Sequence, residues 1–306
     1  MSVPDFQTLM LPVLKACSGG ETEKVTIRAA VAKAMALSES DLAEMLPSRK
    51  MTTYANRVAW ALSYLSIAGL LERARRGVYR LTPEGEAVLQ NPPPRIDMKF
   101  LDRYPAYAEW RRGSRSEGAA PVSASPSSGE LQTATPEELI ESNFQTLTRA
   151  LEGELLERLR QVDASDFESI IIDLLIAMGY GGGKAEMGRA IGRSGDGGID
   201  GIIREDPLGL DIVYVQAKRY GEGNTIGRPD IQGFAGSLDG VGATKGIFFA
   251  TSSFTAGALE YVGRISKRII LIDGKELARL MVAHGVGVRP STSYVIKRID
   301  EDYFAE

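Results

Sequence analysis

The pattern of apolar and polar positions divides the chain into two parts. In the first part, apolar residues recur three and four positions apart, as expected of amphipathic helices. Gly69 ends the longest of these stretches, and residues 72–85 then predict a short hairpin with its turn near Arg76 and Gly77. Helices followed by a β-hairpin are typical of a winged helix-turn-helix domain. The predicted helices lie at 6–18, 26–37, 38–46 and 52–72.

The second part predicts an α/β domain. A capped helix at 163–179 precedes two apolar stretches, 197–206 and 210–220, which predict strands joined by a turn around Leu208. Helices and strands then alternate, so the pattern predicts a three-layer domain with a mixed sheet. The later helices are predicted at 231–240, 254–266 and 274–282, and the later strands at 245–252 and 268–273.

Composition changes between these parts. Residues 113–135 are rich in Ser, Ala, Gly and Pro, cannot bury a core, and predict a flexible linker. Thr135 and Pro136 then begin a helix that extends to residue 162. We therefore expect a winged-helix domain at 1–95, a linker with a short helix at 96–135, and the α/β domain at 136–306.

Overall composition is that of an ordinary globular protein, with 43% hydrophobic and 25% charged residues among 306. No apolar run is long enough to cross a membrane, and the first residues do not resemble a signal peptide. The single cysteine, Cys17, excludes an internal disulfide and fits a reducing compartment. These features predict a cytoplasmic protein without a membrane partner.

Histidine and cysteine are too scarce for several kinds of chemistry. With only His284 and Cys17, one chain cannot build a zinc site mainly from such ligands, nor a nuclease centre that needs several histidines. Hydrolysis would depend on carboxylates, amides and lysine with a hard cation such as Mg²⁺. The Gly-rich stretch at 179–192 follows a helix and lacks the ending of a phosphate-binding loop, so no nucleotide cofactor is expected.

Charge is distributed unevenly. The net charge is −4, yet residues 1–112 hold 16 Lys/Arg and 12 Asp/Glu, a net charge of +4. Basic residues concentrate on the two elements of a winged helix that face DNA, which predicts double-stranded DNA as the partner. A solvated surface on a protein-binding winged helix is the alternative. The candidate DNA-binding residues are Tyr54, Asn56, Arg57 and Trp60 on the recognition helix, and Arg73, Arg75, Arg76 and Arg80 on the wing.

The second domain carries a candidate catalytic group. If the turn is centred on Leu208, Asp200 lies opposite Gln216, and Lys218 follows on the same face of its strand. Glu168, early on the preceding helix, can add a second carboxylate. Asp200, Gln216 and Glu168 offer oxygen ligands for a divalent cation. Lys218 can position or deprotonate water and stabilise charge on the reacting phosphate.

The spacing of Asp200, Gln216 and Lys218 matches a variant of the PD-(D/E)xK nuclease motif, with glutamine where an acid is commoner. The motif alone is weak. However, SGDGGIDGIIREDPLGLDIVYVQAKRY and its flanking segments resemble the catalytic domain of Mrr-type restriction endonucleases. TYANRVAWALSYLSIAGLLERARRGVYRLTPEG resembles the N-terminal winged-helix domain of the same family. The resemblance covers nearly the whole chain apart from the linker.

This resemblance implies a prokaryotic type IV restriction enzyme, which cuts foreign DNA with methylated bases without a partner methyltransferase. It implies that Asp200, Gln216 and Lys218 are catalytic and that Glu168 is an auxiliary ligand. Mg²⁺ is the expected cofactor, with Mn²⁺ as a substitute, and the nucleoid is the expected location when DNA is bound. Cutting both strands implies a homodimer or a higher homo-oligomer, and the helix at 135–162 is its candidate contact surface.

Two alternatives remain open at this point. One is a DNA-binding regulator whose nuclease core is inert. The other is a Holliday-junction or repair nuclease built on the same core. The intact Asp200, Gln216 and Lys218 disfavour the first alternative, and the winged helix and linker disfavour the second.

Overall fold

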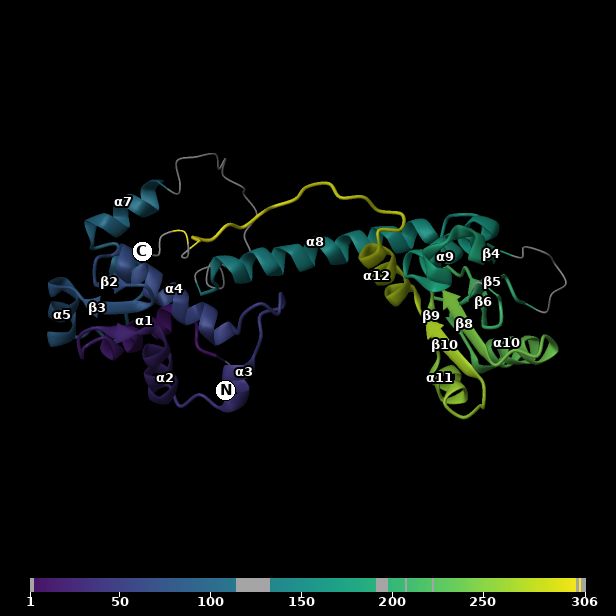
Figure 1. Cartoon of the computed structure of the whole chain (residues 1–306), viewed down its shortest axis with the longest axis horizontal. Helices are drawn as coiled ribbons and strands as arrows, with labels where there is room; N and C mark the ends of the chain where they lie inside the picture. Colours follow the sequence, from purple (N-terminus) through teal and green to yellow (C-terminus); the bar gives the residue numbers. More distant parts are fainter. Residues whose placement is uncertain are drawn as a thin grey trace. The chain divides into compact units, whose positions relative to one another are not determined.

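The computed structural model describes residues 3–113, 133–190, 198–206, 208–221, 223–300 and 303. The stretch rich in Ser, Ala, Gly and Pro, predicted to be a flexible linker, lies mostly outside the described residues. The chain forms two compact units (Figure 1), Met1–Phe144 with Lys297–Glu306, and Gln145–Ile296. Among the described residues, no helix combines the length and apolar character that crossing a membrane requires.

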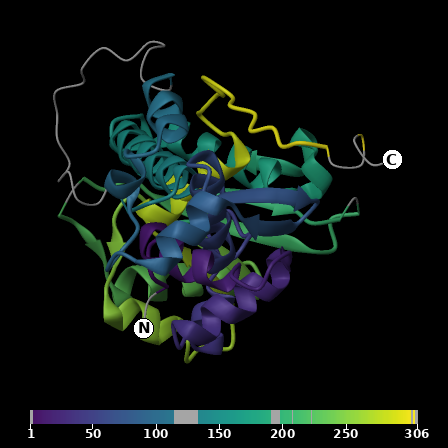
Figure 2. The ribbon, with the colours of Figure 1, turned by 90° about the vertical axis from the view of Figure 1, so that its left-hand side faces the viewer.

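The first unit combines helices with a small sheet (Figure 2). The strand order of this sheet is β1-β3-β2. Val58, Leu62 and Leu65 of the helix α4 are each 1% exposed or less and pack against α1. Gly69 adopts a left-handed conformation (φ 75°) after the longest helix, as expected of a helix end. The elements are α1 (Phe6–Ala16), β1 (Thr22–Glu23), α2 (Lys24–Ala34), α3 (Glu39–Ala43), α4 (Thr53–Ile67), β2 (Leu71–Arg75), β3 (Val78–Leu81), α5 (Pro83–Gln90), α6 (Met98–Leu101) and α7 (Pro105–Gly113).

The hairpin is shorter than predicted. Its second strand ends at Leu81, because Thr82 caps α5 by accepting the Gly85 N–H at 3.1 Å and Pro83 starts that helix. Leu101 and Tyr107, which lie beyond the predicted boundary at residue 95, are buried in the same core as Phe6. The packing of this unit therefore extends at least to α7.

The second unit is built on a five-stranded mixed sheet with the order β10-β8-β6-β5-β4. The strands β6, β8 and β10 are parallel, whereas β4 and β5 are antiparallel additions. One face packs against α9 and α12, and the other against α10 and α11, which confirms the predicted three-layer α/β fold (Figure 1). Phe248 and Phe249, neighbours on β8, point into the two different cores and are at most 1% exposed.

The remaining elements follow the predicted order, with three strands that the sequence pattern did not reveal: β4, β7 and β9. These strands have only two or three residues each, too short for an alternation to be visible. The elements are α8 (Pro136–Leu159), α9 (Ala164–Ala177), η2 (Tyr180–Gly183), η3 (Ala185–Met187), β4 (Gly188–Ala190), β5 (Gly201–Arg204), β6 (Ile212–Lys218), β7 (Thr225–Ile226), α10 (Arg228–Gly240), β8 (Lys245–Ala250), β9 (Ser253–Phe254), α11 (Ala256–Val262), β10 (Arg268–Ile272) and α12 (Gly274–His284).

Candidate active site and DNA interface

The hairpin β5–β6 positions Asp200. Gly201 pairs with Val215, so the same register continued by one residue places Asp200 opposite Gln216. This is the register that a turn centred on Leu208 predicts, and the prediction is confirmed. The Asp200 N–H donates to the Val215 carbonyl at 2.8 Å, and the Asp200 carboxylate accepts the Ala217 N–H at 2.8 Å. Main chain and side chain therefore both hold Asp200 against the strand that carries Gln216 and Lys218.

Gln216 is buried, with 6% of its surface exposed, and its Oε1 has no hydrogen-bond partner among the described residues. Its Nε2 lies so close to the main chain that a Cβ at residue 198 would be 2.7 Å away. Gly198 also adopts a left-handed conformation (φ 94°), so glycine suits this position for two reasons. Leaving a buried acceptor unpaired costs about 1–3 kcal/mol, a cost that a metal ligand role would offset.

The charged groups of the site influence one another. Burial raises the pKa of the Asp200 carboxyl, whereas the Ala217 N–H and the Lys218 ammonium lower it. Burial also raises the pKa of the Glu168 carboxyl; the charge of Asp200 raises it further, and that of Lys218 lowers it. Glu168 lies in the first turns of α9, which packs against β4, β5 and β6. The structure therefore brings Asp200, Lys218 and Glu168 together, with Gln216 beside Asp200.

A divalent cation fits this arrangement of oxygen atoms. Among the described residues, no group of three or more His, Cys, Asp or Glu side chains is placed to hold a metal ion. A metal here would depend on the carboxylates of Asp200 and Glu168 and the amide oxygen of Gln216. Hard cations such as Mg²⁺ prefer oxygen ligands of these kinds. The unpaired Gln216 oxygen is the structural observation that favours such a role.

Replacing Asp200 with asparagine is expected to stabilise the metal-free protein at neutral pH. Burial raises the folded-state pKa of Asp200 above its unfolded value, so folding favours the protonated form. The stability that this preference contributes is complete below the unfolded pKa and is lost as pH rises through the raised folded pKa. Asparagine can still accept the Ala217 N–H and carries no charge to bury.

Because Asp200 is only half-buried and solvent screens its charge, we expect a rise in Tm of about 1–3 °C. The measurement is thermal unfolding in EDTA at pH 7.5 and at pH 4. The difference should shrink at the lower pH, where Asp200 itself takes up a proton. An equal or larger gain at pH 4 would contradict this account.

Two predicted DNA-binding residues of α4 are buried. Tyr54 is 5% exposed, and its hydroxyl donates to the Arg28 carbonyl at 2.6 Å. Burial raises the pKa of the Tyr54 hydroxyl to about 12. Asn56 is 3% exposed, and its Oδ1 accepts a hydrogen bond from the Thr135 hydroxyl at 2.7 Å. In this structure both side chains contact the protein itself, and their contact with DNA stays a prediction.

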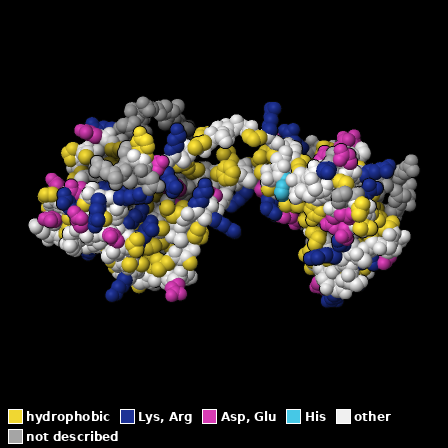
Figure 3. Space-filling view, in the orientation of Figure 1, with side chains coloured by type: hydrophobic (Ala, Val, Ile, Leu, Met, Phe, Trp, Pro, Cys, Tyr) yellow, Lys and Arg dark blue, Asp and Glu magenta, His cyan; other side chains and the backbone are white. Residues whose placement is uncertain are grey.

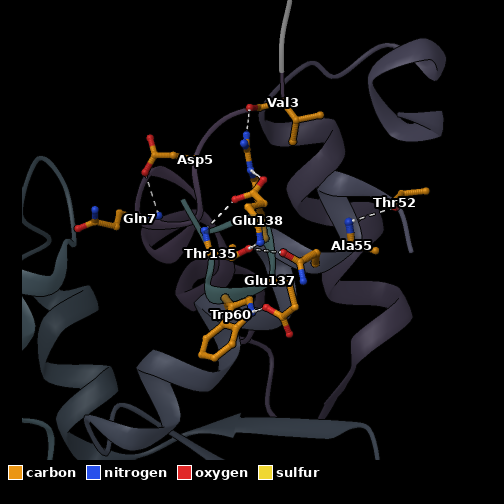
Figure 4. Close-up of polar contacts among 11 residues, drawn as sticks. Val3, Asp5, Gln7, Thr52, Ala55, Trp60, Thr135, Glu137 and Glu138 are labelled. Carbon is orange, nitrogen blue, oxygen red and sulfur yellow. Dashed lines mark hydrogen bonds and ion pairs between the residues drawn. The ribbon is translucent and has the colours of Figure 1, made fainter. Parts of the chain in front are cut away.

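The other two residues on α4 contact the start of α8. Arg57 donates through Nε to Glu138 at 2.8 Å and through a terminal nitrogen to the Val3 carbonyl. Trp60 donates its indole N–H to Glu137 (Figure 4). No local sequence pattern reveals the contacts with Glu138 and Glu137, because these partners are 81 and 77 residues away in the chain.

The wing residues lie on the surface. Arg73, Arg75, Arg76 and Arg80 are all exposed, on β2, β3 and the turn between them. Arg80 forms an exposed ion pair with Glu72, and Arg75 lies 4.0 Å from Glu21. Exposed pairs of this kind are weak and compete poorly with a polyanion. Figure 3 shows Lys and Arg side chains on the visible face of this unit, with acidic side chains among them.

Comparisons with known proteins agree with the fold. A family model described as "Restriction endonuclease" matches residues 159–281, which include the whole five-stranded sheet. A second model, "Mrr N-terminal domain", matches residues 6–91. The two family models together place the protein in the class of restriction endonucleases. The type IV methyl-directed restriction enzyme EcoKMrr of Escherichia coli K12 is 36% identical over 309 residues, covering 99% of this chain and 100% of that protein. The chain belongs to the Mrr family of restriction endonucleases.

Two solved structures are also similar, although distantly. The restriction endonuclease MspJI in complex with a 27-mer oligonucleotide is 18% identical, with a TM-score of 0.30 over 58% of this chain. The DNA modification-dependent restriction endonuclease AspBHI is 17% identical, with a TM-score of 0.36 over 72% of this chain. The matches span 40% and 56% of those two chains.

Proposed function

We propose that the protein is a Mg²⁺-dependent endonuclease that cuts double-stranded DNA carrying methylated bases, with Mn²⁺ able to replace Mg²⁺. The observation that supports this most directly is the buried Gln216 oxygen, which has no hydrogen-bond partner in the described part of the chain and lies beside Asp200 and the Lys218 charge. The relative EcoKMrr is described as methyl-directed, which favours modified DNA as the substrate. Such a substrate locates the protein in the prokaryotic cytoplasm, at the nucleoid when bound.

In the proposed mechanism, Asp200, Glu168 and Gln216 would hold a divalent cation through their oxygen atoms. Such a cation would supply Lewis-acid activation of the scissile phosphate and of the attacking water. Lys218 orients the attacking water and stabilises the negative charge that develops on the phosphate oxygens. The Ala217 N–H keeps the Asp200 carboxylate in place, so this part of the site is formed before DNA arrives.

Cutting both strands requires two such sites, and we propose a homodimer or a higher homo-oligomer. The helix α8 supports this proposal because Ile140, Phe144, Leu147 and Leu151 recur three and four positions apart and are 41–70% exposed. Apolar side chains at this spacing form one stripe on a helix, which a second copy of the chain could cover.

Incubation with plasmid DNA tests the proposed function. Methylated and unmethylated plasmids are incubated with the protein in Mg²⁺ or in EDTA, and the products are separated on a gel. We expect cutting of the methylated plasmid in Mg²⁺ alone. Binding without cutting of either plasmid would favour the regulator with an inert nuclease core. Cutting of branched DNA regardless of methylation would favour a junction or repair nuclease.

Replacing Arg75 and Arg76 with alanine is expected to weaken DNA binding about 10-fold near 100 mM salt. Each lost phosphate contact also lowers the steepness of the salt dependence by about one unit in the log–log slope. The measurement is Kd against salt concentration by fluorescence anisotropy. Arg103→Ala, an exposed arginine outside the wing, is the control. An unchanged slope would remove the wing from the DNA interface.

A further inference from the structure

One face of α4 is occupied by the beginning of α8. Three residues define this face, which we call the α4 face: Asn56, Arg57 and Trp60. Figure 4 shows Trp60 beside Glu137. The Thr135 hydroxyl donates to Asn56, Glu138 accepts from Arg57, and Glu137 accepts from the Trp60 indole. All of these contacts lie within the first compact unit.

The acidic residues of α8 are held in place by the helix itself. Thr135 is fully buried and caps the helix, accepting the Glu138 N–H at 3.3 Å. In return, one oxygen of Glu138 accepts the Thr135 N–H at 2.7 Å, which completes a capping box. The other oxygen of Glu138 faces Arg57 at 2.8 Å. The side chains of this ion pair are only 21% and 14% exposed, so solvent screens it less than a surface pair.

The α4 face presents the kinds of groups that bind phosphate oxygens. A guanidinium fork and an indole N–H are donors without acceptor atoms, and both are satisfied here by carboxylates. Two neighbouring carboxylates on a helix carry charge and acceptor oxygens, as phosphate groups of a DNA strand do. We propose that the α4 face is a DNA-binding surface for which the start of α8 and DNA compete. This inference rests on the proposed DNA binding by the winged-helix unit.

A pair of substitutions that remove charge but keep side-chain shape tests the competition. The variant Glu137→Gln/Glu138→Gln removes both charges, whereas glutamine at the second position preserves the capping box, so the helix start should fold normally. We expect its Kd for duplex DNA to fall about 5- to 10-fold. Its salt dependence should steepen by about one unit, because Arg57 becomes available to a phosphate.

The control is Glu141→Gln/Glu152→Gln, which removes two charges from the same helix at positions outside these contacts. A third variant adds Arg57→Ala to the double glutamine variant and should cancel the gain in affinity. Equal affinities for the two double variants, or a gain that survives Arg57→Ala, would overturn the inference while leaving the proposed function intact. If no variant bound DNA at all, both the inference and the proposed function would fail.

A separate observation concerns the strand that carries Lys218. Thr251 follows β8 and is fully buried. Its N–H donates to the Lys218 carbonyl at 3.1 Å, which extends the pairing of β6 with β8 by one residue. Its hydroxyl accepts the Tyr220 N–H and donates to the Tyr220 carbonyl, both at 2.8 Å.

These three hydrogen bonds fix the position of the main chain at Lys218 and at Tyr220. The following segment contains Gly221 and Gly223, whose flexible main chain would not by itself fix the end of the strand. We infer that Thr251 is a positioning residue: it holds the backbone of Lys218 at the site without contacting DNA. This inference also rests on the proposed role of Lys218.

The chain offers a matched set of variants for this test. Thr251→Val keeps the shape and removes the hydroxyl, Thr251→Ser retains the hydroxyl, and Ser252→Ala removes a neighbouring buried hydroxyl that has no partner among the described residues. We expect Thr251→Val to lower kcat about 10- to 100-fold with unchanged Kd for DNA, since small displacements of catalytic groups have effects of this size. Thr251→Ser should restore most of the rate, and Ser252→Ala should cut normally.

The rates are measured by single-turnover cleavage and the affinities by anisotropy, with Tm recorded for each variant. Full activity of Thr251→Val, alongside an inactive Lys218→Ala, would overturn only this inference. A loss of activity in Ser252→Ala equal to that in Thr251→Val would also overturn it, since general loosening of the core would then explain both. Full activity of Lys218→Ala would instead show that the proposed site is wrong.

Discussion

Replacing Lys218 with alanine is expected to lower the cleavage rate by about 10³-fold or more without changing the affinity for DNA. Removing one preorganised donor that stabilises transition-state charge costs about 10²–10³-fold, and loss of a group that also orients the water adds to this. The residue ends β6 beside Asp200, whose pKa it lowers, and it lies outside the winged-helix unit. Single-turnover cleavage and anisotropy on the same methylated duplex measure the two effects.

Lys245→Ala is the matched control, because Lys245 begins the neighbouring strand β8. It forms ion pairs with Glu205 and Asp211, close to the β5–β6 turn and not to Asp200. We expect this variant to cut at close to the normal rate. Normal cutting by Lys218→Ala would show that the lysine has no catalytic role and would invalidate the proposed site.

Removing the divalent cation is expected to abolish cleavage, and adding Mg²⁺ should restore it in the unmodified protein. In the Asp200→Asn variant, added Mg²⁺ should not restore cleavage. The amide of asparagine keeps the hydrogen bond from Ala217 but takes away one of the two charges available to hold the cation. We expect at least a 10³-fold loss of rate. EDTA treatment followed by Mg²⁺ titration of the cleavage rate, with calorimetric titration of Mg²⁺ binding, measures both changes.

Asp173→Asn, on the same helix as Glu168, provides the control and should respond to Mg²⁺ as the unmodified protein does. Cleavage by Asp200→Asn at high Mg²⁺ would mean that Asp200 is not a required ligand. Cleavage in EDTA by the unmodified protein would contradict the metal-dependent mechanism altogether.

The β5–β6 hairpin of the candidate site could be predicted from sequence because its determinants are local. The turn at Leu208 sets the register, and the period of two in a strand places Gln216 and Lys218 on one face. The position of Glu168 near this hairpin could also be predicted, since its helix immediately precedes the sheet in the chain. In contrast, β4 has three residues and gives no readable alternation, although it forms one edge of the sheet.

The residues that pack against α4 could not be predicted from the local sequence. A recognition helix is identified by its order after the other helices and before a hairpin, but its exposed face depends on what packs against it. Here Thr135 and the acidic residues after it come from about 80 positions along the chain, and nothing in the local pattern of α4 indicates them. The missed helix α5, in contrast, had a visible signal in Thr82 and Pro83.

The choice of glutamine at position 216 affects how tightly the proposed site can hold its cation. An amide adds an oxygen atom but no negative charge, so the carboxylates of Asp200 and Glu168 only just balance a divalent ion, and the Lys218 ammonium beside them opposes its binding. A scissile phosphate would add negative charge to the site, and by thermodynamic reciprocity each of the two ligands then strengthens the binding of the other. Such an enzyme would remain largely unloaded at modest Mg²⁺ concentrations until a DNA strand enters, which limits unintended hydrolysis.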